Sequence, residues 1–191
     1  MDLFYSTLNP KESLQKLSKE ILDNNKTRKK TLSTVNIALE DIGNNVLFIL
    51  PNVTSLGFVQ DENAKGIVAA THEFKIEKYA ITYSYLLPVE HVSRDQIKYF
   101  SVWINKLIDI ILPRLIVCVG ENATLTFFNR KIKIENHGTI IGSVKEIPCI
   151  LTLEPTYYTE HSAFEDEAYK HFLRTRDWSF IKQQYVANIK E

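Results

Sequence analysis

Apolar residues in this chain gather in short continuous runs instead of alternating with polar residues. Four runs are bounded by turn-forming residues and cover 46–50, 79–88, 114–120 and 147–153. A strand that is apolar on both faces is typical of a parallel sheet covered by helices on each side. Each run therefore predicts a buried strand.

Helical periodicity fills the stretches between these runs. Residues 11–23 repeat leucine and isoleucine at helical spacing, and Gly120 leads from its strand into a short helix. The clearest helix follows Ser93, which forms a capping box with Gln96 and precedes a long apolar stripe. Residues 163 to about 187 also have a mostly helical pattern.

The alternation of buried strands with helices predicts an α/β fold. We expect a three-layer α/β/α sandwich whose central sheet is mainly parallel and four-stranded. A length of 191 residues is usual for one domain, so 1–191 is predicted to form a single domain.

Composition excludes several classes of protein. Apolar residues make up 45% of the chain and charged residues 24%, which is typical of a globular domain and not of a disordered one. Polar residues interrupt the longest apolar stretch, 107–119, so no membrane span of roughly 18 to 20 residues is expected. The first residues lack a secretory pattern, so the predicted location is the cytoplasm. Abundant Lys, Asn, Ile and Tyr are consistent with an AT-rich genome, such as that of a phage or a low-GC bacterium.

Cysteine and glycine usage limits the cofactors that the chain is expected to bind. The two cysteines, Cys118 and Cys149, lie in apolar stretches, where a cysteine behaves as a small buried hydrophobe. Two thiols cannot supply the four thiolates of an iron-sulfur cluster. Neither GxGxxG nor GxxxxGK[ST] occurs among the six glycines. The sequence therefore predicts no metal and no cofactor.

The formal net charge is zero, so any contact with DNA has to come from a local basic patch. Two clusters are available: one contains Lys26, Arg28, Lys29 and Lys30, and the other contains Arg130, Lys131 and Lys133. Each cluster is either a solvated surface loop or a site that contacts phosphates.

Chemistry-bearing residues follow the predicted strands. Ligands of open α/β sheets bind beyond the carboxyl ends of the strands, which here are followed by 50–54, 86–91, 120–123 and 153–161. An amide, a carboxylate and two tyrosines at one edge could orient a water molecule and stack on a base. The candidate residues at this edge are Pro51, Asn52, Glu90, His91, Gly120, Glu121, Glu154, Pro155, Thr156, Tyr157, Tyr158 and His161.

The order of these segments resembles the uracil-DNA glycosylase superfamily, most closely the branch that carries an iron-sulfur cluster. Residues 113–123, "PRLIVCVGENA", are similar to that branch's Pro-Arg-Val-Val-Val-Ala-Leu-Gly segment, with Pro113, Arg114, Gly120 and Ala123 matching. The likeness runs from about residue 14 to residue 185. The cluster cysteines of the branch have no counterpart here, so the resemblance implies a member that has lost its cluster.

The resemblance also implies a role for individual residues. "LPNVT" stands at the family's first motif, with Asn52 at the position of an Asn that places the hydrolytic water. Glu154 stands at the His of the second motif, which stabilises negative charge developing on the leaving base, and Pro155 and Thr156 follow the family's pattern. A carboxylate at that position repels the same charge unless it is protonated. Tyr83 replaces the Asn that reads the uracil edge.

A second departure concerns the aromatic residue that stacks on uracil. The family carries a Phe in a Gly-x-Pro-Phe segment, whereas the corresponding region here is "KGIVAATHEF", with Gly66 at the glycine and Val68 near the stacking position.

These substitutions predict a catalytically degenerate uracil-DNA-glycosylase-like protein that acts by binding. Its partner would be single-stranded or locally opened DNA, or a protein of replication, repair or transcription. The alternative is an active monofunctional DNA glycosylase with altered base choice, in which Asn52 places water and Glu154 accepts a hydrogen bond from the base. Two residue interpretations also stay open: Asn52 is either functional or a turn residue, and Tyr157 and Tyr158 either contact a base or pack.

Overall fold

A six-stranded sheet lies at the centre of the computed structural model, which describes residues 9–25, 38–39, 46–52, 61–85, 92–128, 130–160 and 176–189. The strands are β1 (Ala38–Leu39), β2 (Val46–Asn52), β3 (Tyr79–Tyr85), β4 (Leu115–Val119), β5 (Thr139–Val144) and β6 (Ile147–Thr152). The helices are α1 (Pro10–Asn25), α2 (Glu62–Glu73), α3 (Arg94–Ile111), α4 (Gly120–Thr124), the 3-10 helix η3 (Ile134–Asn136), α5 (Pro155–Glu160) and α7 (Arg176–Ile189).

The four predicted strands form the parallel part of this sheet. The strand order is β1-β3-β2-β4-β6-β5, and the four central strands β3, β2, β4 and β6 pair in parallel with one another. The predicted α/β fold with a mainly parallel sheet is therefore confirmed. The expected number of strands was wrong, because β1 adds to β3 and β5 adds to β6, both antiparallel.

The two additional strands carry weak sequence signals. β1 contains only two residues. β5 reads TIIGSV, has exposed and half-buried positions along its whole length, and its register with β6 shifts between Ile140 and Gly142. An edge strand of this kind lacks the continuous apolar run that marked the buried strands.

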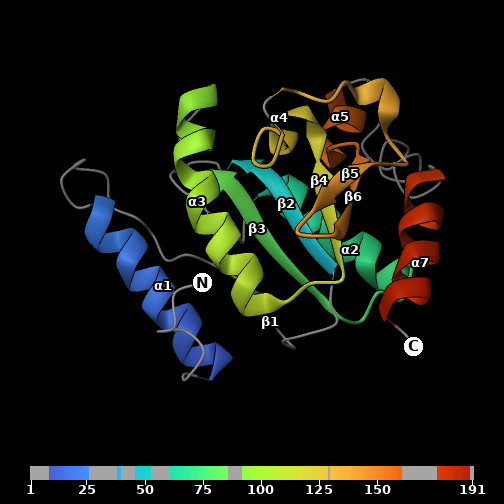
Figure 1. The fold of residues 1–191 in the computed structure, drawn as a ribbon. Helices are drawn as coiled ribbons and strands as arrows, with labels where there is room; N and C mark the ends of the chain where they lie inside the picture. Colours follow the sequence, from blue (N-terminus) through green and yellow to red (C-terminus); the bar gives the residue numbers. More distant parts are fainter. Residues whose placement is uncertain are drawn as a thin grey trace.

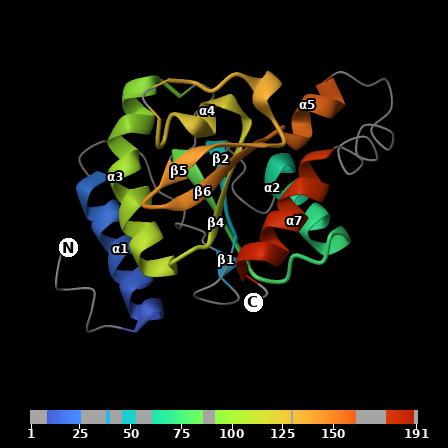
Figure 2. The same ribbon diagram turned by 45° about the vertical axis from the view of Figure 1, so that its right-hand side comes forward.

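Helices cover both faces of the sheet. α1 and α3 lie on one face, and α2 and α7 lie on the other (Figures 1 and 2). On the second face, Phe48 of β2 stacks on Trp178 of α7 with ring centroids 5.8 Å apart, and Trp178 stacks on Phe74 at the same separation. Cys118 and Cys149 are buried in the sheet as predicted, and burial raises the pKa of both thiols, that of Cys149 to about 12.

The predicted capping box begins α3. The Ser93 backbone N–H donates to Gln96 Oε1 at 2.8 Å, and the Gln96 N–H donates to Ser93 Oγ at 3.3 Å. Gln96 also donates to the hydroxyl of Tyr85, at the end of β3, over 3.2 Å. The cap therefore ties the start of α3 to the carboxyl edge of the sheet. No helix in the described part of the chain is long and apolar enough to cross a membrane.

Candidate functional site at the carboxyl edge

Two short helices begin at the carboxyl ends of neighbouring parallel strands. α4 starts directly after β4, and α5 starts two residues after β6. Both lie at the same end of the sheet in Figures 1 and 2. The predicted meeting of 120–123 with the residues after β6 is confirmed, because both segments line one cavity.

This cavity has a volume of about 300 Å³, at the lower end of the range for ligand sites. Five predicted site residues, Gly120, Glu121, Glu154, Thr156 and Tyr157, line it together. The described lining residues are Gly120, Glu121, Asn122, Lys131, Ile134, Glu154, Thr156 and Tyr157. The cavity therefore combines two carboxylates, a cation and an aromatic ring.

Gly120 allows the Glu154 side chain to approach the start of α4. Its φ of +77° lies in the left-handed region, which favours glycine. A Cβ at this position would lie 2.6 Å from Glu154 Cδ, and closer still to Oε1. The positive φ favours glycine at this position, and any Cβ there would displace the Glu154 side chain from the place it occupies.

Asn63 of α2 holds the turn that carries Glu154, and it was not predicted. Its Nδ2 donates to Glu154 Oε2 at 3.4 Å, and its Oδ1 accepts from the Thr156 N–H at 3.0 Å. The same helix packs against Pro155, since a Cβ at Gly66 would lie 2.5 Å from the proline Cβ. The sequence signal was the N-cap two residues earlier, where Asp61 accepts from the Ala64 N–H at 2.9 Å.

The resemblance placed the base-stacking segment in this region, which the structure shows to be helix α2. Gly66 lies inside α2 and faces Pro155, and Val68 is a partly exposed residue of the same helix. Gly66 therefore has a packing role in the contact between α2 and α5.

A loop after α4 brings a basic residue to the cavity. The Ile134 N–H donates to Glu121 Oε1 at 2.7 Å, and the Ile132 N–H donates to Thr124 Oγ1 at 3.0 Å. These bonds fix the loop against α4, so that Lys131, directly before Ile132, lines the cavity. Arg130, Lys131 and Lys133 are all exposed. Lys26, Arg28, Lys29 and Lys30 lie outside the described residues, as do Glu90, His91 and His161.

Three other predicted residues lie elsewhere at or near this edge. Asn52 is the last residue of β2, is half-buried, and is not among the described lining residues. Pro51 is buried, and its carbonyl accepts a hydrogen bond from the Ser84 hydroxyl. Tyr83 is buried inside β3, where burial and the nearby Asp61 carboxylate raise its pKa. The structure does not bring these side chains into the cavity with Glu154.

The helix α5 carries both predicted tyrosines, Tyr157 and Tyr158. Tyr157 lines the cavity and is 41% exposed, so its ring is accessible to a ligand. Tyr158 belongs to the backbone of α5, but its side chain lies outside the described part of the structure.

A buried carboxylate anchors the far end of the basic loop. Asp177 of α7 is fully buried, and its Oδ1 lies 2.6 Å from His137 Nδ1. Its Oδ2 accepts from the Thr152 hydroxyl of β6 at 2.9 Å. Arg176 adds a bond of 3.2 Å to the carbonyl of His137. This network joins α7, the end of β6 and the loop that carries Lys131.

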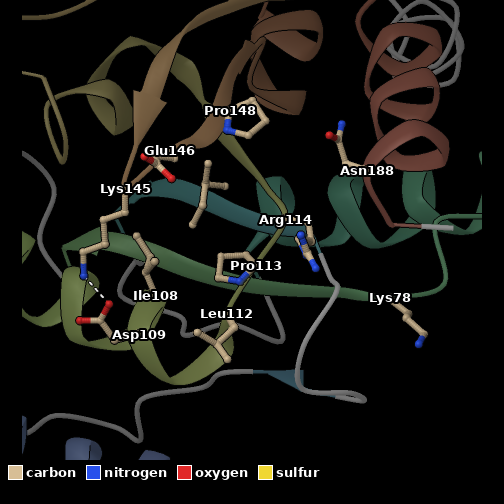
Figure 3. Close-up of a pocket in the computed structure, with 11 residues that line it drawn as sticks. Lys78, Ile108, Asp109, Leu112, Pro113, Arg114, Lys145, Glu146, Pro148 and Asn188 are labelled. Atoms are coloured by element: carbon tan, nitrogen blue, oxygen red, sulfur yellow. Dashed lines mark hydrogen bonds and ion pairs between the residues drawn. The ribbon is translucent and has the colours of Figure 1, made fainter. Parts of the chain in front are cut away.

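A second, larger cavity of about 760 Å³ lies at the opposite edge (Figure 3). Its described lining residues are Lys78, Ile108, Asp109, Leu112, Pro113, Arg114, Lys145, Glu146, Ile147, Pro148 and Asn188. Lys145 forms an ion pair with Asp109, and donates to the Asn105 carbonyl at 3.2 Å. This cavity lies where strands begin, whereas sheets of this class bind ligands where strands end. We therefore place the candidate site at the smaller cavity.

The smaller cavity supplies hydrogen-bond acceptors, one ammonium group and an aromatic face. Among the described residues, no cluster of three His, Cys, Asp or Glu side chains could hold a metal ion. Comparison of the sequence with protein-family models and with curated proteins gives no match. The resemblance to uracil-DNA glycosylases therefore stays a prediction.

Proposed function

We propose that the carboxyl edge of the sheet binds single-stranded or locally opened DNA without excising uracil. The observation that carries this proposal is the position of Lys131, which lines the same cavity as Glu154 and Tyr157. Exposed Lys and Arg side chains supply most of the affinity for phosphates. An exposed tyrosine ring stacks on bases of any sequence, and stacking is strongest where bases are unpaired.

Two features of the site argue against uracil excision. Negative charge develops on the base as the glycosidic bond breaks, and donors around that charge accelerate the reaction. Glu154 places a carboxylate in the cavity instead. Asn52, the residue expected to place the water, is not among the described residues around it.

The test is a titration of the protein with a fluorescent single strand at several salt concentrations. The triple variant Arg130→Gln, Lys131→Gln, Lys133→Gln should bind more weakly, with the salt slope reduced by about 2, since each single-strand phosphate contact contributes about 0.7. A matched control replaces Arg28, Lys29 and Lys30 by Gln, because it removes the same net charge. This control should retain most of the affinity.

Three outcomes contradict the proposal. If only the control loses affinity, the phosphates lie at the other cluster and not at the cavity. Equal losses in both variants would indicate a general charge effect. Absence of binding at about 20 mM salt, where the Debye length exceeds 20 Å, would favour a protein partner over DNA.

A second candidate function is an active glycosylase with altered base choice. The bond from Asn63 to Glu154 favours it, because a held carboxylate could bind a base that offers an extra donor. Excision assays with each damaged or normal base in a single strand would test it. Cleavage that is abolished by Asn52→Ala would establish this candidate in place of binding alone.

A further inference from the structure

We infer that His137 is a nucleophilic histidine that accepts a phosphoryl group at Nε2, an activity beyond the proposed binding of DNA. His137 lies between η3 and β5 and is not among the described residues that line the carboxyl-edge cavity. Three features carry the inference. They are a buried carboxylate at one ring nitrogen, an accessible second nitrogen and an arginine beside the ring.

The buried carboxylate of Asp177 fixes which nitrogen of the ring carries the hydrogen. Its Oδ1 lies 2.6 Å from His137 Nδ1, and its Oδ2 accepts from the Thr152 hydroxyl at 2.9 Å. Asp177 lies in the first turn of α7, where the positive end of the helix dipole stabilises a negative charge. An ionised carboxylate only accepts hydrogen bonds, so Nδ1 is the donor. The neutral ring therefore has its lone pair at Nε2.

Gly138 allows this carboxylate to lie close to the backbone beside His137. Its φ of +67° lies in the left-handed region, and a Cβ there would lie 2.5 Å from Asp177 Oδ1. Any other residue at position 138 would displace the carboxylate. The residue that follows His137 therefore preserves the contact that orients its ring.

The second ring nitrogen is available to a reactant. The side chain of His137 is 27% exposed, whereas that of Asp177 is fully buried. Because Nδ1 faces the buried carboxylate, the exposed surface belongs to the far part of the ring, which includes Nε2. Within the described part of the chain, Nε2 makes no hydrogen bond. An oriented, accessible lone pair of this kind is a nucleophile.

Arg176 supplies donors for an anionic group beside the ring. It is exposed, and its Nη2 donates to the His137 carbonyl at 3.2 Å. A guanidinium carries five N–H donors in a fork that matches phosphate oxygens. This is its one hydrogen bond to the described residues, so the remaining donors can bind the oxygens of a phosphoryl group.

The step balances with an acyl phosphate as the phosphoryl donor. The Nε2 lone pair forms a bond to phosphorus, the bond from phosphorus to the acyl oxygen breaks, and the carboxylate leaves with that electron pair. No proton moves, because Nδ1 keeps its hydrogen. The ring becomes positively charged as the new bond forms. The carboxylate of Asp177, already in contact with the ring, stabilises that charge.

The test is incubation of the full chain with acetyl phosphate, followed by phosphorus NMR and by mass spectrometry of peptides kept at alkaline pH. His72 is the internal control, because it is exposed in α2 and its ring has no hydrogen-bond partner among the described residues. His137 is less exposed. It should nevertheless be phosphorylated at least about tenfold faster, and at Nε2, because its ring is oriented and its charge is stabilised.

Variants test the two supporting residues. Asp177→Asn should slow phosphorylation of His137 by at least about tenfold and leave that of His72 unchanged, since an amide no longer fixes the hydrogen on Nδ1. Arg176→Gln should slow it by a smaller factor. Arg130→Gln is the matched control, because it removes the same charge from an exposed position before η3, and it should keep the rate. The comparison with His72 uses the unaltered protein, so it stays decisive even if Asp177→Asn fails to fold.

Phosphorylation of His137 no faster than that of His72 would overturn the inference. A product phosphorylated at Nδ1, or an unchanged rate in folded Asp177→Asn, would overturn it too. Each of these results would leave Asp177 with a structural role alone. DNA binding at the cavity does not depend on His137, so the proposed function stands or fails separately.

Discussion

The two ends of the sheet carry cavities of opposite character. The cavity at the amino edge is more than twice as large, but it is formed where strands start, and the ion pair between Lys145 and Asp109 neutralises two of its charges. The carboxyl-edge cavity is smaller, and backbone turns hold Glu154, Lys131 and Tyr157 around it. The difference shows that the larger cavity of such a sheet need not lie at the edge where its ligands are expected to bind.

Uracil excision at the carboxyl edge would contradict this description of the site most directly. We expect excision from a uracil-containing single strand to be slower than in active members of the superfamily by at least about 100- to 1000-fold, the usual cost of losing one donor to developing charge. Glu154→His should raise the rate. Single-turnover cleavage assays measure both. A rate normal for the superfamily, lost in Asn52→Ala, would contradict the assignment.

The next largest effect should come from the network that anchors the basic loop. Asp177→Ala leaves the buried Thr152 hydroxyl and His137 Nδ1 without their acceptor. We expect the free energy of unfolding to fall by about 2 to 3 kcal/mol in urea denaturation. Gln183→Ala, at an exposed position of the same helix and outside this network, is the control and should cost less than about 1 kcal/mol. Equal losses would mean that the network does not stabilise this edge.

A smaller effect should separate the two reasons for glycine at position 120. Gly120→Ala should destabilise the protein by about 1 to 3 kcal/mol, because its φ is positive and its Cβ would meet Glu154. Adding Glu154→Ala removes the collision but not the unfavourable φ. The double variant should therefore be more stable than the two separate losses predict. Thermal unfolding of all four proteins measures this coupling, and simple additivity would argue against the contact.

The smallest effect is expected at the amino edge. Lys145→Ala removes a solvent-exposed ion pair with Asp109, which should change the free energy of unfolding by no more than about 0.5 kcal/mol. It should leave the affinity for single-stranded DNA unchanged, in contrast to changes around Lys131. Loss of DNA binding in this variant would instead place the nucleic-acid surface at the amino edge of the sheet.

The parallel part of the fold could be predicted because its signals are local. The strands β2, β4 and β6 are apolar runs, and β3 is rich in β-branched and aromatic residues. The start of α3 is marked by a serine and a glutamine whose reciprocal bonds are present. α2 was missed because Gly66 and several alanines replace the large apolar residues of an amphipathic stripe. Its signal was Asp61, whose side chain caps the helix.

The candidate site could be predicted only in part, for a different reason. The end-of-strand rule correctly brought Gly120, Glu154, Thr156 and Tyr157 together. Asn63 joins them through a contact between segments far apart in the sequence, and Lys131 joins them because the loop after α4 folds back on that helix. Neither arrangement is recorded in a local sequence pattern. The sequence contains two basic clusters. Only the fold of the loop after α4 shows that Lys131, from one of them, lies beside the cavity.

The irregular edge strand β5 has a consequence for how the protein behaves at high concentration. An unpaired strand edge is a template on which another chain can add a strand, which begins aggregation. In the described residues β5 pairs with β6 alone, while the register shift at Gly142 and the charged turn at Lys145 and Glu146 interrupt its outer edge. A strand from a second molecule therefore finds no long, flat row of hydrogen-bonding groups to extend. The irregularity that concealed this strand in the sequence also disfavours the addition of a further strand at this edge of the sheet.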